Sequence, residues 1–159
     1  MSRALQAATL AGALGCGLVG GVCFAFSAFV APALDRLPAA QSIAAMQSIN
    51  KVAVTPAFML AFVGSAVICV GLGIYALGSR EGPWAWALAG SAVFLFGVIV
   101  VSAAGNIPLN DTLDGVDPGA ANAAARWSDY YDSWLALNHV RAAAGITASG
   151  LLAIALALA

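Results

Sequence analysis

The 159-residue chain is 62% hydrophobic and only 8% charged, and its mean hydropathy is +0.95. About a quarter of the residues of a soluble domain are charged, so this composition excludes an ordinary soluble domain and predicts one integral membrane domain over residues 1–159. The net charge of −1 and the absence of a Lys/Arg-rich run exclude a nucleic-acid-binding surface. The three cysteines, Cys16, Cys23 and Cys69, fall in apolar stretches and are interpreted as small buried hydrophobes.

The first apolar stretch, residues 4–34, contains no charge. Because a spanning helix needs about 20 residues, we predict a first span at about residues 5–31, with Pro32 marking its exit. Gly17 and Gly21 form a GxxxG pair, which predicts the close approach of another helix.

Residues 35–51 have a different pattern, in which the apolar residues Ile43 and Met46 recur at helical spacing among polar residues. This predicts an amphipathic helix at the membrane interface between the first two spans. Gln47 and Asn50 share one side of it, either as a solvated face or as part of a site.

The second and third spans are predicted at about residues 54–78 and 85–105, joined by a short turn. Gly90 and Gly97 are one heptad apart and predict another close helix contact. Pro108 is expected to end or kink the third span. The amides of Asn106 and Asn110, which flank it, either cap the helix and turn or donate to a ligand.

The fourth helix is expected to begin near Ala120, with its span at about residues 134–157. An aromatic, amide and guanidinium stripe runs along one face of this helix at spacings of four and three residues, and it consists of Trp127, Tyr131, Trp134, Asn138 and Arg141. Polar groups at membrane depth are costly and usually mark a functional site.

The positive charge of this stripe needs a partner in the membrane. The nearest acidic candidates by topology are Asp111, Asp129 and Asp132. The chain's one histidine, His139, lies in the same segment and is interpreted either as a satisfied buried histidine or as a catalytic one.

These elements predict an all-α fold, a four-transmembrane-helix bundle with the amphipathic interfacial helix between spans one and two and a polar loop between spans three and four. Four spans place both termini on one side. The amphipathic helix and the loop, expected over residues 106–134, share the opposite side with nearly all of the polar chemistry.

Three segments together resemble the DUF1772 family, also called the anthrone oxygenase family: MQSIN at residues 46–50, NIPLN at residues 106–110, and W-x3-NHVR at residues 134–141. The exit of the first span, FAFSAFVAPAL, also fits. The resemblance implies a monooxygenase, an oxidoreductase that oxidises an anthrone to an anthraquinone with O2 and without metal or flavin. Similarity to the bacterial members implies a location in the inner (plasma) membrane.

The first hypothesis is therefore a cofactor-independent oxygenase for a planar aromatic or other lipophilic substrate. His139 is the expected base, because histidine is the usual proton acceptor near neutral pH. Arg141 is expected to stabilise the anion or to orient the histidine, and Asn138 to bind the oxyanion. The expected substrate-binding residues are Asn106, Asn110, Trp134, Tyr131, Gln47 and Asn50.

The second hypothesis is a non-enzymatic membrane protein that binds a lipid, quinone or haem or supports a partner, with homo-oligomers through the Gly-rich spans as a further possibility. One histidine and no CxxC motif provide too few ligands for zinc or a di-iron centre. We therefore predict no metal and no cofactor. Interhelical hydrogen bonds in membranes average only about 0.6 kcal/mol, which favours a ligand site over polar side chains that merely hold helices together.

Overall fold

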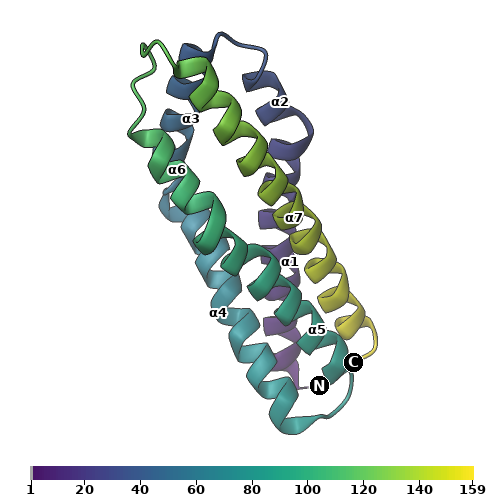
Figure 1. The fold of residues 1–159 in the computed structure, drawn as a ribbon. Helices are drawn as coiled ribbons and strands as arrows, with labels where there is room; N and C mark the ends of the chain where they lie inside the picture. Colours follow the sequence, from purple (N-terminus) through teal and green to yellow (C-terminus); the bar gives the residue numbers. More distant parts are fainter. Residues whose placement is uncertain (1) are drawn as a thin grey trace.

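The structure, a computed structural model, describes residues 2–159, and that range contains helices and no strand. Four long helical segments form a bundle (Figure 1), and they are Arg3–Leu34, Pro56–Ser79, Trp84–Asp114 and Ala123–Ala157. Each is long and apolar enough to cross a membrane. The predicted all-α, four-span fold class is confirmed, and the chain is an integral membrane protein.

Two of the long segments contain π-helical turns. The first consists of α1 (Arg3–Ala25), the π-helix η1 (Phe26–Val30) and α2 (Ala31–Leu34). The third consists of α5 (Trp84–Phe94), the π-helices η2 (Leu95–Val100) and η3 (Ser102–Asn106), and α6 (Ile107–Asp114). The remaining helices are α3 (Ala39–Ala53), α4 (Pro56–Ser79) and α7 (Ala123–Ala157).

The outer surface of the bundle suits lipid. Large apolar side chains such as Leu14, Leu60, Val67 and Phe96 are exposed on it. The 35 residues of α7 measure about 52 Å at about 1.5 Å per residue, whereas the hydrocarbon core of a bilayer is about 30 Å thick. The end of α7 that begins at Ala123 therefore extends beyond the bilayer core.

Pro108 does not end the third long helix, which was one of the two outcomes predicted for it. Proline has no N–H, and its ring clashes with the carbonyl four residues earlier. The π-helical turn η3 lies directly before this proline, and its wider backbone lets the helix continue to Asp114. The loop before α7 is correspondingly short, covering residues 115–122 rather than 106–134. Pro32 follows η1 in the same way, and its helix ends at Leu34.

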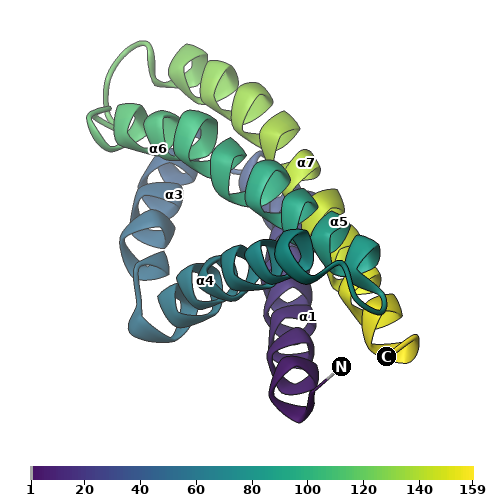
Figure 2. The ribbon, with the colours of Figure 1, turned by 90° about the horizontal axis from the view of Figure 1, so that it is seen from below.

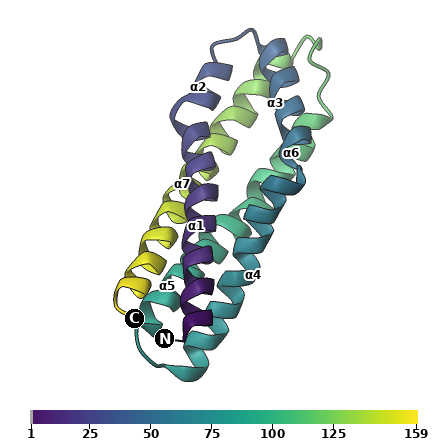
Figure 3. The ribbon, with the colours of Figure 1, turned by 180° about the vertical axis from the view of Figure 1, so that it is seen from behind.

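Both termini lie at the same end of the bundle, which faces the viewer in Figure 2, as predicted. The helix α3 lies beside α6 at the opposite end (Figure 3). It is amphipathic as expected, since Ile43 and Met46 are buried and Lys51 is exposed. The polar segments that the sequence places on one side of the membrane therefore do gather at one end of the bundle.

The closest helix contact joins α1 to α7 through Gly20 and Gly145. A Cβ built on Gly145 would lie 2.6 Å from the Cα of Gly20. The predicted GxxxG pair is wrong in its second member, because Gly21 has no atom within 4 Å of a built Cβ. The predicted contacts at Gly90 and Gly97 are confirmed, since their built Cβ atoms would overlap the side chains of Leu152 and Ala144 on α7, respectively.

Gln47 joins α3 to the end of α6. Its Nε2 donates to the main-chain oxygens of Leu113 and Val116, each at 2.9 Å. The Leu113 oxygen also accepts the Val116 main-chain N–H at 3.0 Å, and Val116 lies just past the end of α6. The amide therefore adds a donor to the last turn of α6 and supplies one to the loop that follows it. The neighbouring ion pair, Lys51 with Asp114 at 3.1 Å, is 68% and 52% exposed, and such pairs stabilise by only about 0–1 kcal/mol.

Replacing Gln47 with methionine is expected to loosen α3 while the rest of the bundle stays folded. Each lost hydrogen bond contributes about 0.5–1.5 kcal/mol, so amide exchange in α3 should accelerate by about tenfold or more through local opening. Hydrogen–deuterium exchange followed by mass spectrometry measures this. Gln41→Met is the matched control, because Gln41 is on the same helix but is exposed. Equal exchange rates in the two variants would contradict the tethering role.

Candidate functional site

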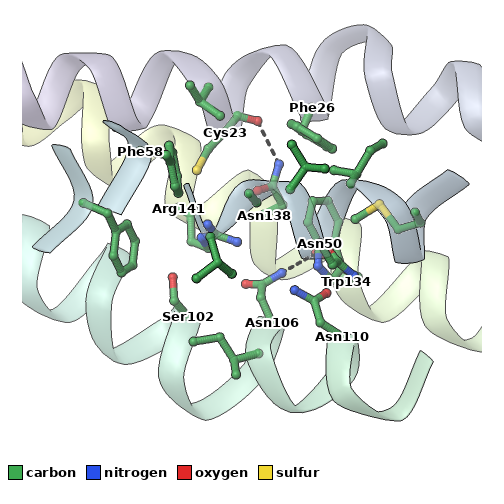
Figure 4. A pocket seen from close by; sticks show the side chains of 18 of the residues that line it. Cys23, Phe26, Asn50, Phe58, Ser102, Asn106, Asn110, Trp134, Asn138 and Arg141 are labelled. Carbon is green, nitrogen blue, oxygen red and sulfur yellow. Dashed lines mark hydrogen bonds between the residues drawn. The ribbon is translucent and has the colours of Figure 1, made fainter. Parts of the chain in front are cut away.

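A cavity of about 560 Å³ lies between α1, α3, α4, the η3–α6 segment and α7 (Figure 4). It separates two apolar clusters. One, at the end of the termini, includes Phe94, Val98 and Leu152, and the other, at the α3 end, includes Ile43 and Leu113. The cavity lining includes Cys23 of the first cluster and Met46 and Trp134 of the second.

The cavity walls are mostly apolar and rich in aromatic rings. Phe26 and Trp134 lie on one side with ring centroids 5.7 Å apart. Phe58 and Phe62 of α4 form a stacked pair with centroids 6.0 Å apart. Aromatic faces of this kind favour flat, apolar ligands.

Five polar side chains project into these apolar walls (Figure 4), and they are Asn50, Ser102, Asn106, Asn110 and Arg141. A sixth, Asn138, is held by α1: its Nδ2 donates to the Cys23 main-chain oxygen at 2.8 Å and to the Ser27 hydroxyl at 2.9 Å. Cys23 lies just before the π-helical turn η1. The Cys23 carbonyl also accepts the Phe26 main-chain N–H, and its second lone pair accepts this amide.

Two further amides are fixed by their partners on α7. Asn106 Nδ2 donates to the main-chain oxygen of Trp134 at 3.1 Å, and Asn110 Oδ1 accepts from the Tyr130 hydroxyl at 2.9 Å. The η3 turn positions both Ser102 and Asn106 toward the cavity. π-Helical turns occur frequently at functional sites.

Four buried polar atoms of the cavity lining have no hydrogen-bond partner: Asn50 Nδ2, Asn106 Oδ1, Trp134 Nε1 and Arg141 Nε. In residues 2–159 the one other such atom is Ser91 Oγ, away from the cavity. Native proteins pair more than about 90% of buried polar groups. These four atoms gather around one cavity and leave positions at which a ligand or water is able to bond.

The guanidinium of Arg141 has no carboxylate partner, contrary to the expectation that Asp111, Asp129 or Asp132 would pair with it. Within the described residues, Lys51–Asp114 is the one pair of opposite charges within 4.0 Å. Asp132 is nine residues from Arg141 on the same helix, about 13.5 Å along its axis, and all three aspartates are exposed. A permanent cation therefore borders an apolar cavity with no protein anion beside it.

The structure brings together six of the predicted site residues around the cavity: Asn50, Asn106, Asn110, Trp134, Asn138 and Arg141. It does not bring Tyr131, which packs against the α3-end cluster, or Gln47, which ties α3 to α6. It also leaves His139 exposed and outside the cavity. Successive residues of a helix point about 100° apart, so if Asn138 faces inward, His139 faces outward.

Several lining residues escape a search of the sequence for polar motifs. Ser102 could have been found, because it lies four residues before Asn106 and so on the same helix face. Phe58 and Phe62 of α4 have the same spacing but no polar neighbour that would distinguish them from lipid-facing residues. In residues 2–159, no group of three or more His, Cys, Asp or Glu side chains is arranged to hold a metal ion.

Fold and site together define a four-helix integral membrane protein with an aromatic-lined cavity between its helices and unpaired polar groups in the cavity lining. The family model of anthrone oxygenase matches residues 53–151, which is more than half of the chain and includes five of the six residues gathered at the cavity. The chain belongs to the anthrone oxygenase family. No curated protein and no solved structure matches it.

Proposed function

We propose that the cavity is the substrate site of a cofactor-independent oxygenase that acts with O2 on a planar, lipophilic, anthrone-like ketone. Family membership and the aromatic walls support this proposal. The single observation that carries it is the Arg141 guanidinium, which borders an apolar cavity without a protein anion. That arrangement suits a ligand on which negative charge develops during the reaction.

The proposed chemistry begins with loss of a proton from the methylene carbon opposite the anthrone carbonyl. The electron pair moves onto the carbonyl oxygen, giving an enolate. Arg141 and the Trp134 indole N–H supply donors for this oxygen, and their effect is larger in an apolar cavity than in water. No carboxylate or imidazole is among the described residues that line the cavity, so the proton passes to water.

The enolate itself is the electron donor to O2 in this proposal. It transfers one electron, the carbon radical and superoxide combine to form a C–O bond, and protonation gives a hydroperoxide. Loss of water from the hydroperoxide forms the second carbonyl. The sum is anthrone plus O2 giving anthraquinone plus water, and it balances without a further reductant.

Proteoliposomes supplied with emodin anthrone test the proposal. Anthraquinone formation above the protein-free rate, with one O2 consumed per product and label from isotopic O2 in the new carbonyl, is the expected result. A rate equal to that of protein-free liposomes would contradict an oxygenase and favour a membrane protein that binds a quinone. The unpaired donors Asn50 Nδ2, Trp134 Nε1 and Arg141 Nε also suit such a ligand.

His139→Ala is expected to keep the wild-type rate in this assay. The imidazole is exposed and outside the cavity, so removing it leaves every group in the proposed chemistry in place. A large loss of rate in a variant that unfolds at the wild-type temperature would instead assign the histidine the base role that the sequence predicts.

A further inference from the structure

The side-chain amide of Asn106 has a fixed orientation. The residue is 1% exposed, and its Nδ2 donates to the main-chain oxygen of Trp134. A main-chain oxygen can only accept a hydrogen bond, so rotating the amide by 180° would place two acceptors against each other. Nδ2 is therefore the atom that faces the Trp134 main-chain oxygen, and Oδ1 is the atom that does not take part in this bond.

This Oδ1 is buried and has no partner. The other unpaired groups of the cavity lining, Arg141 Nε, Trp134 Nε1 and Asn50 Nδ2, are all donors, yet none of them bonds to it. Burying an acceptor without a partner is costly. Among these four buried unpaired atoms Asn106 Oδ1 is the one acceptor, so a ligand that pairs all four has a donor as well as acceptor oxygens.

We propose that Asn106 is a specificity-determining residue, whose Oδ1 accepts a hydrogen bond from a hydroxyl on the ligand while an acceptor oxygen of the ligand faces Arg141. A hydroxylated aryl ketone provides both groups. A quinone or ketone that has acceptors only leaves Oδ1 unpaired. This inference rests on the proposed function in assuming that the cavity binds a planar aromatic ketone, and it adds the selection for a hydroxyl donor.

A cycle of ligand and protein changes tests the assignment. The ligands are 2-hydroxyfluorenone and 2-methoxyfluorenone, planar aryl ketones that lack a reactive methylene. In the second a methyl group replaces the hydroxyl hydrogen and removes the donor. Their dissociation constants are measured by tryptophan fluorescence in detergent for wild type and Asn106→Leu. We expect wild type to bind the hydroxyl ligand about tenfold more tightly, in keeping with one hydrogen bond to a buried group. In Asn106→Leu the two constants should become nearly equal.

Ser102→Ala is the matched control. Ser102 lies on the same π-helical turn and lines the same cavity, but its hydroxyl already donates to the Val98 main-chain oxygen at 2.6 Å. Its removal should keep the tenfold preference. Asn106→Ala removes Oδ1 without adding bulk and serves if the leucine variant does not assemble. Because the readout is a ratio within one sample, partial unfolding affects both ligands equally.

An undiminished preference for the hydroxyl ligand in both Asn106 variants would overturn the inference. So would equal binding of the two ligands by wild type. In either case the binding itself would leave the proposed function standing. Failure of wild type to bind either ligand would overturn the proposed function, and this inference with it.

Discussion

Arg141→Met is expected to lower the rate of anthraquinone formation by about 10²–10³-fold, the usual cost of removing one oxyanion donor. Methionine keeps an unbranched apolar stem at this position and removes the guanidinium, so the cavity lining becomes uncharged. The enolate oxygen would then lose its only fully charged partner in the cavity lining. Initial rates in proteoliposomes, corrected for the spontaneous oxidation, measure the effect.

The same variant is expected to be at least as stable as wild type. A cation in an apolar environment without an anion partner costs free energy, and Arg141 has no such partner among the described residues. Loss of activity together with an equal or higher unfolding temperature is the signature of a group that serves the ligand rather than the fold. The oxidation rate of Arg141→Lys should fall between those of wild type and Arg141→Met, because lysine keeps the charge but loses the planar fork of donors.

Arg126→Met is the control for the charge change, because Arg126 is exposed on the same helix. It should have the wild-type rate. Wild-type activity in Arg141→Met would show that the guanidinium does not act on the reaction. A sharp drop in its unfolding temperature would show that Arg141 is structural.

The part of the site on α7 could be predicted because a straight α-helix has a fixed period. Trp134, Asn138 and Arg141, at spacings of four and three, reach the same cavity. The same geometry argues against His139, which the sequence made attractive as its only histidine. Chemical type suggested a base there, whereas its angular position on the helix directs it away from the cavity.

Other features depend on contacts that no local pattern encodes. The π-helical turn before Pro108 allows its helix to continue past a residue that usually ends one. Phe58 and Phe62 resemble lipid-facing residues until α4 is placed against the cavity. The glycines of α1 likewise cannot be ranked from the sequence, because Gly17, Gly20 and Gly21 are equally small. The position of α7 determines which of them lies at the helix contact.

Gly20→Ala and Gly145→Ala are expected to destabilise the bundle by about 1–3 kcal/mol each, the usual cost of overpacking. The Cβ of Gly20 would lie 2.7 Å from the main-chain nitrogen of Ile146, and that of Gly145 would lie 2.9 Å from the main-chain nitrogen of Gly20. Backbone atoms cannot rotate away as side chains do. The two helices would have to separate, and packing is the main force that joins helices in lipid.

Gly21→Ala and Gly150→Ala are the controls, one on each helix, since a Cβ built at either position has no atom within 4 Å. Alanine favours a helix over glycine by about 0.8–1.0 kcal/mol, so these variants should be as stable as wild type or slightly more. Thermal unfolding in detergent should show a lower stability for Gly20→Ala and Gly145→Ala and an equal or higher stability for the two controls. This difference distinguishes an effect on helix packing from an effect on helix propensity.

Separation of α1 and α7 would also stretch the bonds from Asn138 to Cys23 and Ser27. Oxidation rates of Gly20→Ala and Gly145→Ala should therefore fall even where the protein remains folded, and unchanged rates with unchanged stability would contradict the close α1–α7 contact.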